Sequence, residues 1–481
     1  MKRHPANPDR QHDFGHLHIL GICGTAMAAI AALAKAKGWR VTGSDAGVYP
    51  PMSDYLAGLG IDIAPYHVDN LAPQPDLVVI GNALSRGNPE VEAVLDRGIP
   101  YTSGAQFVGD HILPGRLAVV AAGTHGKTTT ASLLAHVLET AGQQPGFLIG
   151  GVPENFGGGA RLGEGAPFIL EGDEYDTAFF DKRSKFLHYH AHTLILNNLE
   201  YDHADIFPDL ESIKRQFQHL IRTLPSQGKI IVNADDTNLS DVLSRGSWTP
   251  IIPFGQKGKT DSPSEPEWQW EATADDGTSF RLYRGGECVI EANWGMIGTH
   301  HVANACAVAA AVTTLGVDAV TIAKAFETFA GVRRRMTLVG EARGIRIFDD
   351  FAHHPTAIAG IVQAAKAAMK GAGRLWVIVE PRSNTMRTRI HQERLPGCFG
   401  GADRVIFVPA SARNLKADEV LDTGAVCRAI GAHAQVLPDV ASIIGVVGKD
   451  ARQGDHVLIL SNGGFDGIHQ KMLTALQTRA N

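Results

Sequence analysis

The sequence predicts an α/β protein of three domains, each built around a mainly parallel sheet. Short segments rich in Val, Ile and Leu alternate with helical patterns along almost the whole chain, and this alternation is typical of parallel strands covered by helices. Glycine is abundant, at 53 of 481 residues, as expected for many tight turns between strands and helices. The length suits about three domains of ordinary size.

Composition and charge exclude several classes of function. The net charge of −6 argues against a general nucleic-acid surface. No apolar run approaches the roughly 18 residues of a membrane helix, and the polar segment 1–16 lacks the apolar core of a secretory signal. The five cysteines are scattered without a C-x-x-C pair, which favours free thiols over zinc or disulfides. We expect a cytoplasmic protein that binds neither nucleic acid nor membrane; its oligomeric state is unknown from sequence.

The first domain, residues 1–115, is expected to be Rossmann-like. A strand over 17–22 leads into Gly-Ile-Cys-Gly-Thr-Ala-Met at 21–27, which opens a helix, and a second strand over 39–43 ends at an acidic residue. In such βαβ units a phosphate rests on the helix N-terminus and the acid holds a ribose. The fingerprint is incomplete, because alanine stands where the third glycine would fall. The candidate binding residues are Gly21, Gly24, Thr25, Ala26, Met27, Ser44 and Asp45.

The second domain, residues 116–330, opens with the most informative motif of the chain. An apolar strand over 117–121 is followed by Gly-Thr-His-Gly-Lys-Thr at 123–128 and then by a helical pattern. Strand, glycine loop and helix together predict a phosphate-binding loop. Lys127 is expected to neutralise the β- and γ-phosphates, and the Thr128 hydroxyl to bind Mg²⁺. The candidate nucleotide-binding residues are Gly123, Thr124, His125, Gly126, Lys127, Thr128 and Thr129.

Acidic residues follow two further strands of this domain. Four carboxylates lie within 171–176, directly after a strand over 168–170, and His203 lies among acids after a strand over 193–196. Ligand sites of α/β domains form at the carboxyl ends of strands, and carboxylate oxygens suit Mg²⁺. Glu171 is therefore a candidate metal ligand beside Thr128, and His203, at a neighbouring strand end, is a further candidate. A polar loop over 256–267 and a β insertion of three short strands over 268–294 are expected later in the domain.

The third domain, residues 331–481, is again expected to be Rossmann-like. It opens on three consecutive arginines, and Asp-Asp-Phe-Ala-His-His-Pro at 349–355 follows a strand over 345–348. Arg335 lies where it could reach a γ-phosphate across an interdomain cleft, and a carboxylate of 349–355 could take ribose hydroxyls.

The order of these motifs resembles the Mur ligase family, the ATP-dependent amide-forming enzymes of peptidoglycan synthesis. The resemblance covers nearly the whole chain and rests on the motifs at 123–128, 171–174, 198–203, 298–304, 334–335 and 349–355. It implies ATP with Mg²⁺ or Mn²⁺, an acyl-phosphate intermediate, and Lys127, His203 and Arg335 in catalysis. It also implies Thr128 and Glu171 on a first metal ion, His203 on a second, Asn304 against adenine and Asp350 on the ribose. Two positions depart from the family: His301 replaces an asparagine, and Gln218 stands where several members carry a carbamoylated lysine, so no such modification is predicted.

Within the family, 21–27 and 349–355 fit members that act on UDP-N-acetylmuramate. One such member adds L-alanine, and another adds the tripeptide L-alanyl-γ-D-glutamyl-meso-diaminopimelate in peptidoglycan recycling. Segments 171–186 and 380–386 resemble the second. We therefore expect UDP-N-acetylmuramate and the murein tripeptide as substrates. Arg382, Asn384 and Arg387 follow a strand over 374–379 and are expected to hold the peptide, since the planar fork of arginine suits carboxylates.

Several alternatives stay open at this point. The L-alanine ligase is the nearest. A folate polyglutamate ligase fits the first domain poorly, a nucleotide-dependent switch needs fewer acidic clusters, and an NAD-dependent dehydrogenase leaves the phosphate loop unexplained. Asp202, His203 and His353 are all candidate bases for the attacking amine, and the sequence does not choose among them.

Overall fold

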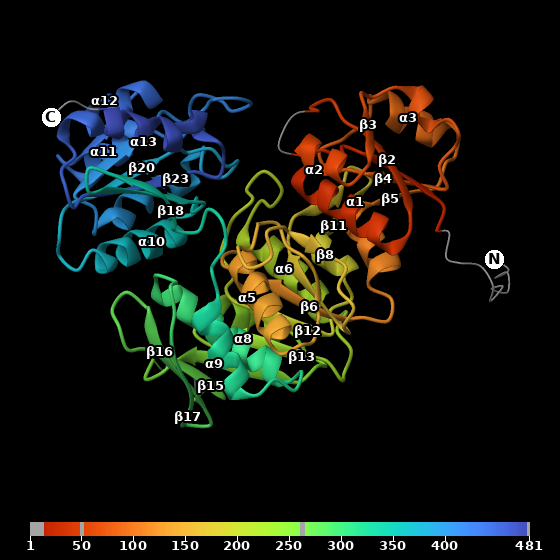
Figure 1. Cartoon of the computed structure of the whole chain (residues 1–481), viewed down its shortest axis with the longest axis horizontal. Coiled ribbons are helices and arrows are strands. Elements are labelled where there is room, and N and C mark those ends of the chain that lie inside the picture. The colour runs from red at the N-terminus through yellow and green to blue at the C-terminus, as the bar shows by residue number, and fades with distance from the viewer. Residues whose placement is uncertain (1–13, 49–51, 260–264, 479–481) are drawn as a thin grey trace.

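The structure is a computed structural model that describes residues 14–48, 52–259 and 265–478. The segments 1–16 and 256–267 fall partly outside these ranges. Three α/β bodies follow one another along the chain, with the first and third standing above the second (Figure 1). Each large sheet lies within one of the predicted domains, so the predicted three-domain α/β fold is confirmed, and we propose 1–115, 116–330 and 331–481 as the domain limits. No helix among the described residues is long and apolar enough to cross a membrane.

The first sheet is entirely parallel, in the order β3-β2-β1-β4-β5. The strand order reverses between β1 (His16–Leu20) and β4 (Leu77–Ile80), and ligands of such sheets bind beyond the carboxyl ends of the strands at this reversal. Helix α1 (Thr25–Lys37) follows β1 there. The remaining elements are β2 (Arg40–Ser44), α2 (Met52–Gly58), β3 (Asp62–Ala64), α3 (Pro89–Asp96), β5 (Tyr101–Ser103) and α4 (Gly104–Phe107).

The central sheet has ten strands in the order β17-β16-β15-β14-β13-β12-β6-β9-β7-β8. Its middle strand β6 (Leu117–Ala122) lies between β9 (Pro167–Gly172) and β12 (Thr193–Leu196), parallel to both. Alternate residues of β6 therefore enter opposite core layers. The strands outward from these three are β7 (Gly146–Leu148), β8 (Ala160–Arg161), β13 (Lys229–Asn233) and β14 (Ile251–Gln256).

Helices cover both faces of the central sheet. Apolar residues of α5 (Lys127–Thr140), α8 (Thr299–Thr313) and α9 (Ala319–Thr328) form one layer. Those of α6 (Leu210–Ile221) and α7 (Thr237–Ser244) lie in the other, which continues into the first domain.

The predicted β insertion is an antiparallel meander of β15 (Trp268–Ala272), β16 (Ser279–Arg284) and β17 (Glu287–Asn293). Its first strand pairs in parallel with β14. The meander therefore extends the central sheet and is not a separate unit.

A short hairpin, unforeseen from the sequence, joins the central and first domains. It consists of β10 (Asp176–Ala178) and β11 (Asp181–Ser184). Phe179 and Phe180 at its turn pack against the first-domain core, and the Phe180 ring meets Tyr101 edge-on at 5.0 Å between centroids. The segment that begins with the acidic residues 171–176 therefore ends in a hairpin that packs against the first domain.

The third sheet has the order β18-β19-β23-β20-β21-β22 and is parallel except at β18 (Thr337–Ala342). Its other strands are β19 (Ile345–Asp350), β20 (Leu375–Val379), β21 (Arg404–Phe407), β22 (Ala434–Val436) and β23 (His456–Leu460). Helices α10 (Pro355–Ala368), α11 (Thr423–Ile430), α12 (Val440–Asp450) and α13 (Ile468–Thr478) supply core residues on its two faces.

Candidate active site between the domains

The phosphate-binding loop connects β6 to α5 and requires glycine at two positions. Gly123 and Gly126 have φ angles of 142° and 79°, which favour glycine. A Cβ atom at Gly126 would lie 3.0 Å from the Asn304 side-chain oxygen, and one at Gly123 would lie 3.0 Å from the Asn198 carbonyl oxygen. The predicted adenine contact, Asn304 of α8, therefore lies directly against the loop. Any larger residue at either glycine would meet both strain and a close contact.

Lys127 lies at the start of α5, largely buried. Its Nζ donates to the Gly123 carbonyl at 2.9 Å and pairs with Glu174 Oε2 at 2.9 Å. Burial lowers the pKa of Lys127, but the carboxylates of Glu174 and Asp173 outweigh this effect and raise it above its ordinary value. The loop therefore holds a firmly charged ammonium group where a phosphate would rest.

Glu174 also contacts His203. From the sequence we expected His203 to lie near Glu171. Glu174 Oε1 lies 3.1 Å from His203 Nε2, and the carboxylate is almost fully buried. Burial lowers the pKa of His203, but the hydrogen bond and charge of Glu174 raise it overall. The acidic run 171–176 is evident in the sequence, but nothing in it indicates that Glu174 is the residue that contacts both Lys127 and His203.

The backbone of His203 is left-handed, with a φ of 54°. Its N–H donates to Asp202 Oδ1 at 2.7 Å. A non-glycine residue in this conformation is uncommon and is often found at functional sites. The conformation helps to aim the imidazole at Glu174.

Thr128 and Glu171 form a second pair at the same sheet edge. The Thr128 hydroxyl donates to Glu171 Oε1 at 2.7 Å, and the Gly150 N–H donates to Glu171 Oε2 at 2.7 Å. Burial and the charge of Asp173 raise the pKa of Glu171. The structure therefore gathers hydroxyl and carboxylate oxygens at the ends of β6 and β9, a donor set that suits Mg²⁺.

The arginines that open the third domain have different environments. Arg334 pairs with Asp349 at 3.1 Å and donates to the carbonyls of Ser461 and Gly463, each at 2.7 Å. Arg335 lies over the Phe351 ring at 5.1 Å and forms no ion pair within the described part of the chain. Its guanidinium group therefore remains available for an anion.

Asp350 is buried, and both of its carboxylate oxygens accept backbone hydrogen bonds. Met336 N–H donates to Oδ2 at 2.7 Å and Ala352 N–H donates to Oδ1 at 2.8 Å. These bonds fix the carboxylate next to the arginine segment. Each oxygen keeps a further lone pair for a hydroxyl group.

The loop after β12 touches the third domain at several points. Glu200 Oε2 accepts from the Thr356 hydroxyl at 2.7 Å and from Arg394 at 3.2 Å. Asn384 donates to Asp205 Oδ2 at 2.8 Å. The third domain is therefore docked against the strand ends that carry the acidic residues.

Comparison with known proteins decides the family. Three family models match in chain order: the Mur ligase family catalytic domain over residues 16–115, the Mur ligase middle domain over 121–312 and the Mur ligase glutamate ligase domain over 334–463. The chain belongs to the Mur ligase family. It is an ATP-dependent amide ligase of this family, as the motifs predicted.

Two curated relatives and one solved structure illustrate the similarity. The Escherichia coli (strain K12) UDP-N-acetylmuramate–L-alanyl-γ-D-glutamyl-meso-2,6-diaminoheptandioate ligase is 46% identical, covering 96% of this chain and 99% of its own. The UDP-N-acetylmuramate–L-alanine ligase of Alkaliphilus metalliredigens is 30% identical over 96% of this chain and 98% of its own. A murein peptide ligase crystal structure from Psychrobacter arcticus 273-4 is 43% identical, covers 97% of this chain and all of its own, and has a TM-score of 0.72.

In this Mur ligase, the first-domain candidates divide into exposed and buried residues. Gly24, Thr25 and Ala26 are exposed at the start of α1, whereas Met27 and Ser44 are buried. Gly21, with a φ of 76°, turns the chain beyond β1. Exposure makes the first group suitable for direct contact with a ligand. Burial limits the second group to shaping the site.

Asp45 closes the turn after β2. Its carboxylate accepts from the N–H groups of Cys23 and Gly47, each at 2.9 Å. Behind it, buried Glu90 accepts from the Ser44 hydroxyl and, at 2.8 Å, from the His67 N–H. These bonds hold the glycine turn and the end of β2 together at the reversal of strand order.

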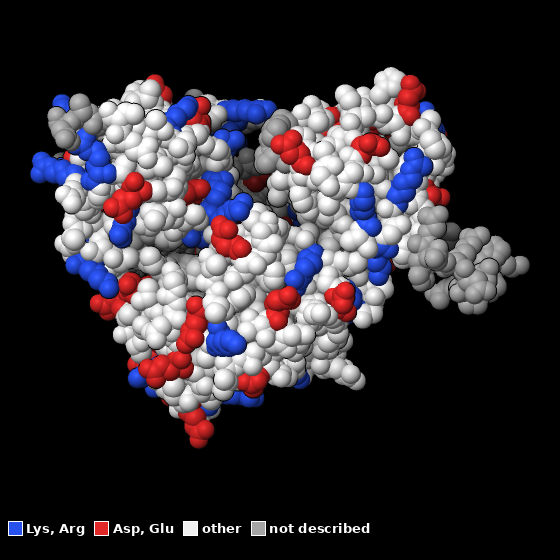
Figure 2. All heavy atoms as spheres, in the orientation of Figure 1, with Lys and Arg blue, Asp and Glu red and all other residues white. Residues whose placement is uncertain are grey.

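The third-domain candidates also differ from one another. Arg387 donates to the Arg413 carbonyl at 2.8 Å and to Asn384 at 3.1 Å, so it ties down the loop that holds Arg413. Arg382 is 56% exposed and lies 3.6 Å from Glu380. Arg382 is therefore the freer cation. Figure 2 shows a hollow between the first and third domains, with Lys and Arg side chains on the third-domain side.

Proposed function

We propose that this protein joins UDP-N-acetylmuramate to the tripeptide L-alanyl-γ-D-glutamyl-meso-diaminopimelate through an amide bond, with ATP converted to ADP and phosphate. The observation that carries the proposal is the identity to ligases named for this tripeptide, 46% and 43% over 96% of the chain. The L-alanine ligase of Alkaliphilus metalliredigens reaches only 30%.

ATP would lie on the phosphate-binding loop. Residues 123–129 would hold its phosphates, Asn304 would contact adenine and Asp350 the ribose. Lys127 and Arg335 would neutralise the γ-phosphate from the central and third domains. The position of Asn304 against Gly126 supports this arrangement.

A first divalent cation, Mg²⁺ or Mn²⁺, would be held by Thr128 and Glu171, and a second by His203, with Glu174 as a further ligand. When bound, these ions would supply positive charge beside the phosphates. The oxygens of Thr128 and Glu171, 2.7 Å apart, fit this role. In this structure the carboxylate of Glu174 pairs with both Lys127 and His203. When ATP and the cation bind, a phosphate would replace Glu174 beside Lys127, and the cation would bind His203.

The chemistry follows from the weakness of a carboxylate as an electrophile. Phosphorylation of the UDP-N-acetylmuramate carboxylate gives an acyl phosphate, and phosphate is a good leaving group. Phosphoryl transfer depends on positioning and charge neutralisation, which Lys127 and Arg335 would supply. The tripeptide amine then attacks the acyl carbon, and phosphate leaves.

His353 is the favoured candidate for taking the amine proton. Burial lowers its pKa, so it is neutral near pH 7. Its Nδ1 lies 2.9 Å from the Phe351 carbonyl, which only accepts hydrogen bonds, so the basic nitrogen is Nε2. His203 is less suited, because its raised pKa keeps it more protonated. Asp202 is a weaker base, because the neighbouring histidines hold its pKa far below its usual range.

The two organic substrates would occupy the outer domains. UDP-N-acetylmuramate would rest at the carboxyl ends of β1 and β4, on Gly21, Gly24, Thr25, Ala26 and Asp45. The tripeptide would approach from the third domain, where Arg382 offers an exposed guanidinium group and Asn384 and Arg387 shape the loop.

The test is ADP release with UDP-N-acetylmuramate and a series of amines: L-alanine, the dipeptide, the tripeptide and a tetrapeptide. We expect the highest kcat/KM with the tripeptide. A much higher kcat/KM with L-alanine would move the assignment to the L-alanine ligase.

A further inference from the structure

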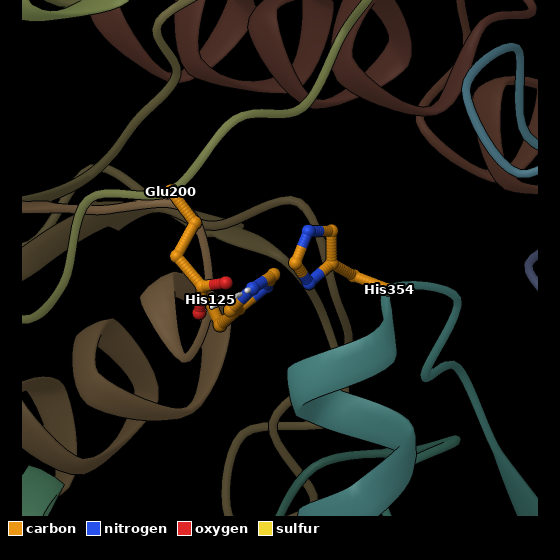
Figure 3. Close-up of side chains that lie close together, drawn as sticks. All are labelled: His125, Glu200 and His354. Atoms are coloured by element: carbon orange, nitrogen blue, oxygen red, sulfur yellow. Dashed lines mark ion pairs between the residues drawn. The ribbon is translucent and has the colours of Figure 1, made fainter. Parts of the chain in front are cut away.

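Three side chains from separate segments converge where the central and third domains meet. His125 belongs to the phosphate-binding loop, Glu200 follows β12, and His354 precedes α10 (Figure 3). One ligand atom of each lies within 4.8 Å of the others. None of the three has been given a metal-binding role above.

His125 presents a buried nitrogen without a partner. Its Nε2 forms no hydrogen bond, and the carboxylate oxygen Glu200 Oε1 lies 3.7 Å away, too far for one. Burial lowers the pKa of His125 far below its usual range, so the ring is neutral. Buried polar atoms are rarely left unpaired. This nitrogen is therefore available to a ligand that approaches between it and the carboxylate.

His354 is oriented as a metal-binding histidine would be. Its Nε2 lies 3.3 Å from the Tyr201 carbonyl, which can only accept, so Nε2 carries the proton and Nδ1 the lone pair. A backbone carbonyl on the outer nitrogen is the usual way of fixing a ligating imidazole. The competing contact, from the Thr356 N–H to Nδ1, is long at 3.4 Å.

Glu200 has one oxygen engaged and one turned towards His125. Oε2 accepts from Thr356 and Arg394, whereas Oε1 faces the His125 ring. Arg394 offsets part of the carboxylate charge, so the imidazoles would supply much of the affinity. Two imidazoles and one carboxylate favour Zn²⁺ and similar ions over Mg²⁺. A tetrahedral Zn²⁺ with bonds of about 2.0 Å separates its donor atoms by roughly 3.3 Å, close to the 3.7 Å between His125 and Glu200.

We propose that His125, Glu200 and His354 form a further cation site, which takes a transition-metal ion such as Zn²⁺. It is separate from the Thr128–Glu171 site and from the His203 site. Because two ligands come from the central domain and one from the third, an ion bound here would hold the two domains in this docked arrangement.

The test uses Co²⁺ as a visible probe of the full-length protein without nucleotide, with Zn²⁺ as the competitor. We expect one Co²⁺ with d–d absorption bands, displaced by Zn²⁺ and not by Mg²⁺. His354→Gln and Glu200→Gln should each weaken this binding at least tenfold. His203→Ala, which alters the His203 site, and His219→Gln, at an exposed histidine of α6, should leave it intact.

Three results would overturn the proposal. Binding that is unchanged in both His354→Gln and Glu200→Gln, or binding that is lost in His203→Ala alone, would place the cation elsewhere. Glu200→Asp guards against misfolding, because it keeps the charge and shortens the ligand. Circular dichroism of each variant confirms that it is folded, and a folded Glu200→Asp with wild-type affinity would also contradict the site.

Discussion

At the scale of single residues, the chemistry depends on charges placed at three strand ends. Lys127, Glu171 and His203 could be named from sequence because a glycine loop or a strand precedes each of them. The exact pairing could not be foreseen. Glu174, and not Glu171, bridges Lys127 and His203, since the choice depends on how the chain turns after β9.

Lys127→Ala should abolish acyl-phosphate formation, with kcat lowered by about a thousandfold or more. The loop would lose its only point charge on the γ-phosphate from the central domain. Binding of UDP-N-acetylmuramate to the first domain should remain nearly intact in calorimetry. Loss of both ligands would show that the two sites are not separate.

Glu171→Gln should raise the Mg²⁺ concentration needed for half-maximal rate, because it removes one carboxylate charge while keeping the size of the side chain. The measurement is the rate as a function of Mg²⁺ at saturating ATP. An unchanged Mg²⁺ dependence would show that Glu171 does not bind the metal and only forms hydrogen bonds with Thr128 and Gly150.

The His203–Glu174 pair should make stability depend on pH. The pKa of His203 is raised in the folded protein, so the pair stabilises fully below the ordinary histidine pKa of about 6.5 and the effect is lost as pH rises through the raised value. In urea unfolding with a chelator present, Glu174→Gln should cost about 1 kcal/mol more near pH 6 than near pH 9. An equal cost at both values would argue against a charged pair.

At the scale of elements, regular alternation made most of the fold predictable. Strong strands such as β6, β12 and β20 are continuous apolar runs. Elements with weaker signals were missed: β18 is interrupted by Gly340, β22 has only three residues, and α11 and α12 occupy a segment without a marked motif. The hairpin β10–β11 was hidden because charged residues dominate it and its two aromatic residues face another domain.

Arg382 lies in the connection that follows β20. Arg382→Ala should raise KM for the tripeptide by a larger factor than it changes KM for ATP. The exposed guanidinium group of Arg382 can form two parallel hydrogen bonds with a substrate carboxylate. Arg404→Ala, at the opposite end of β21 from the site, is the matched control. Wild-type KM for the tripeptide in Arg382→Ala would place the peptide elsewhere, with residues 182–185 the next to test.

At the scale of the whole molecule, the site exists only where the domains meet. Pairs such as Asn384–Asp205 and Arg394–Glu200 join residues more than 170 positions apart. A single sequence offers no signal for such contacts, which is why the convergence of His125, Glu200 and His354 was also missed.

Arg394→Ala should loosen the docking of the third domain and admit water to the acyl phosphate. The expected result is more ADP released per amide formed, measured by assaying both products in one reaction. A ratio of one ADP per amide in the variant would show that this contact does not protect the intermediate.

This Mur ligase is expected to transfer the intact tripeptide. The most direct measurement is a competition in which UDP-N-acetylmuramate and ATP are incubated with equal concentrations of L-alanine and tripeptide, and the products are identified by mass spectrometry. The ratio of the two products then equals the ratio of the kcat/KM values. We predict UDP-N-acetylmuramoyl-tripeptide as the dominant product. A mixture dominated by UDP-N-acetylmuramoyl-L-alanine would contradict the proposed function.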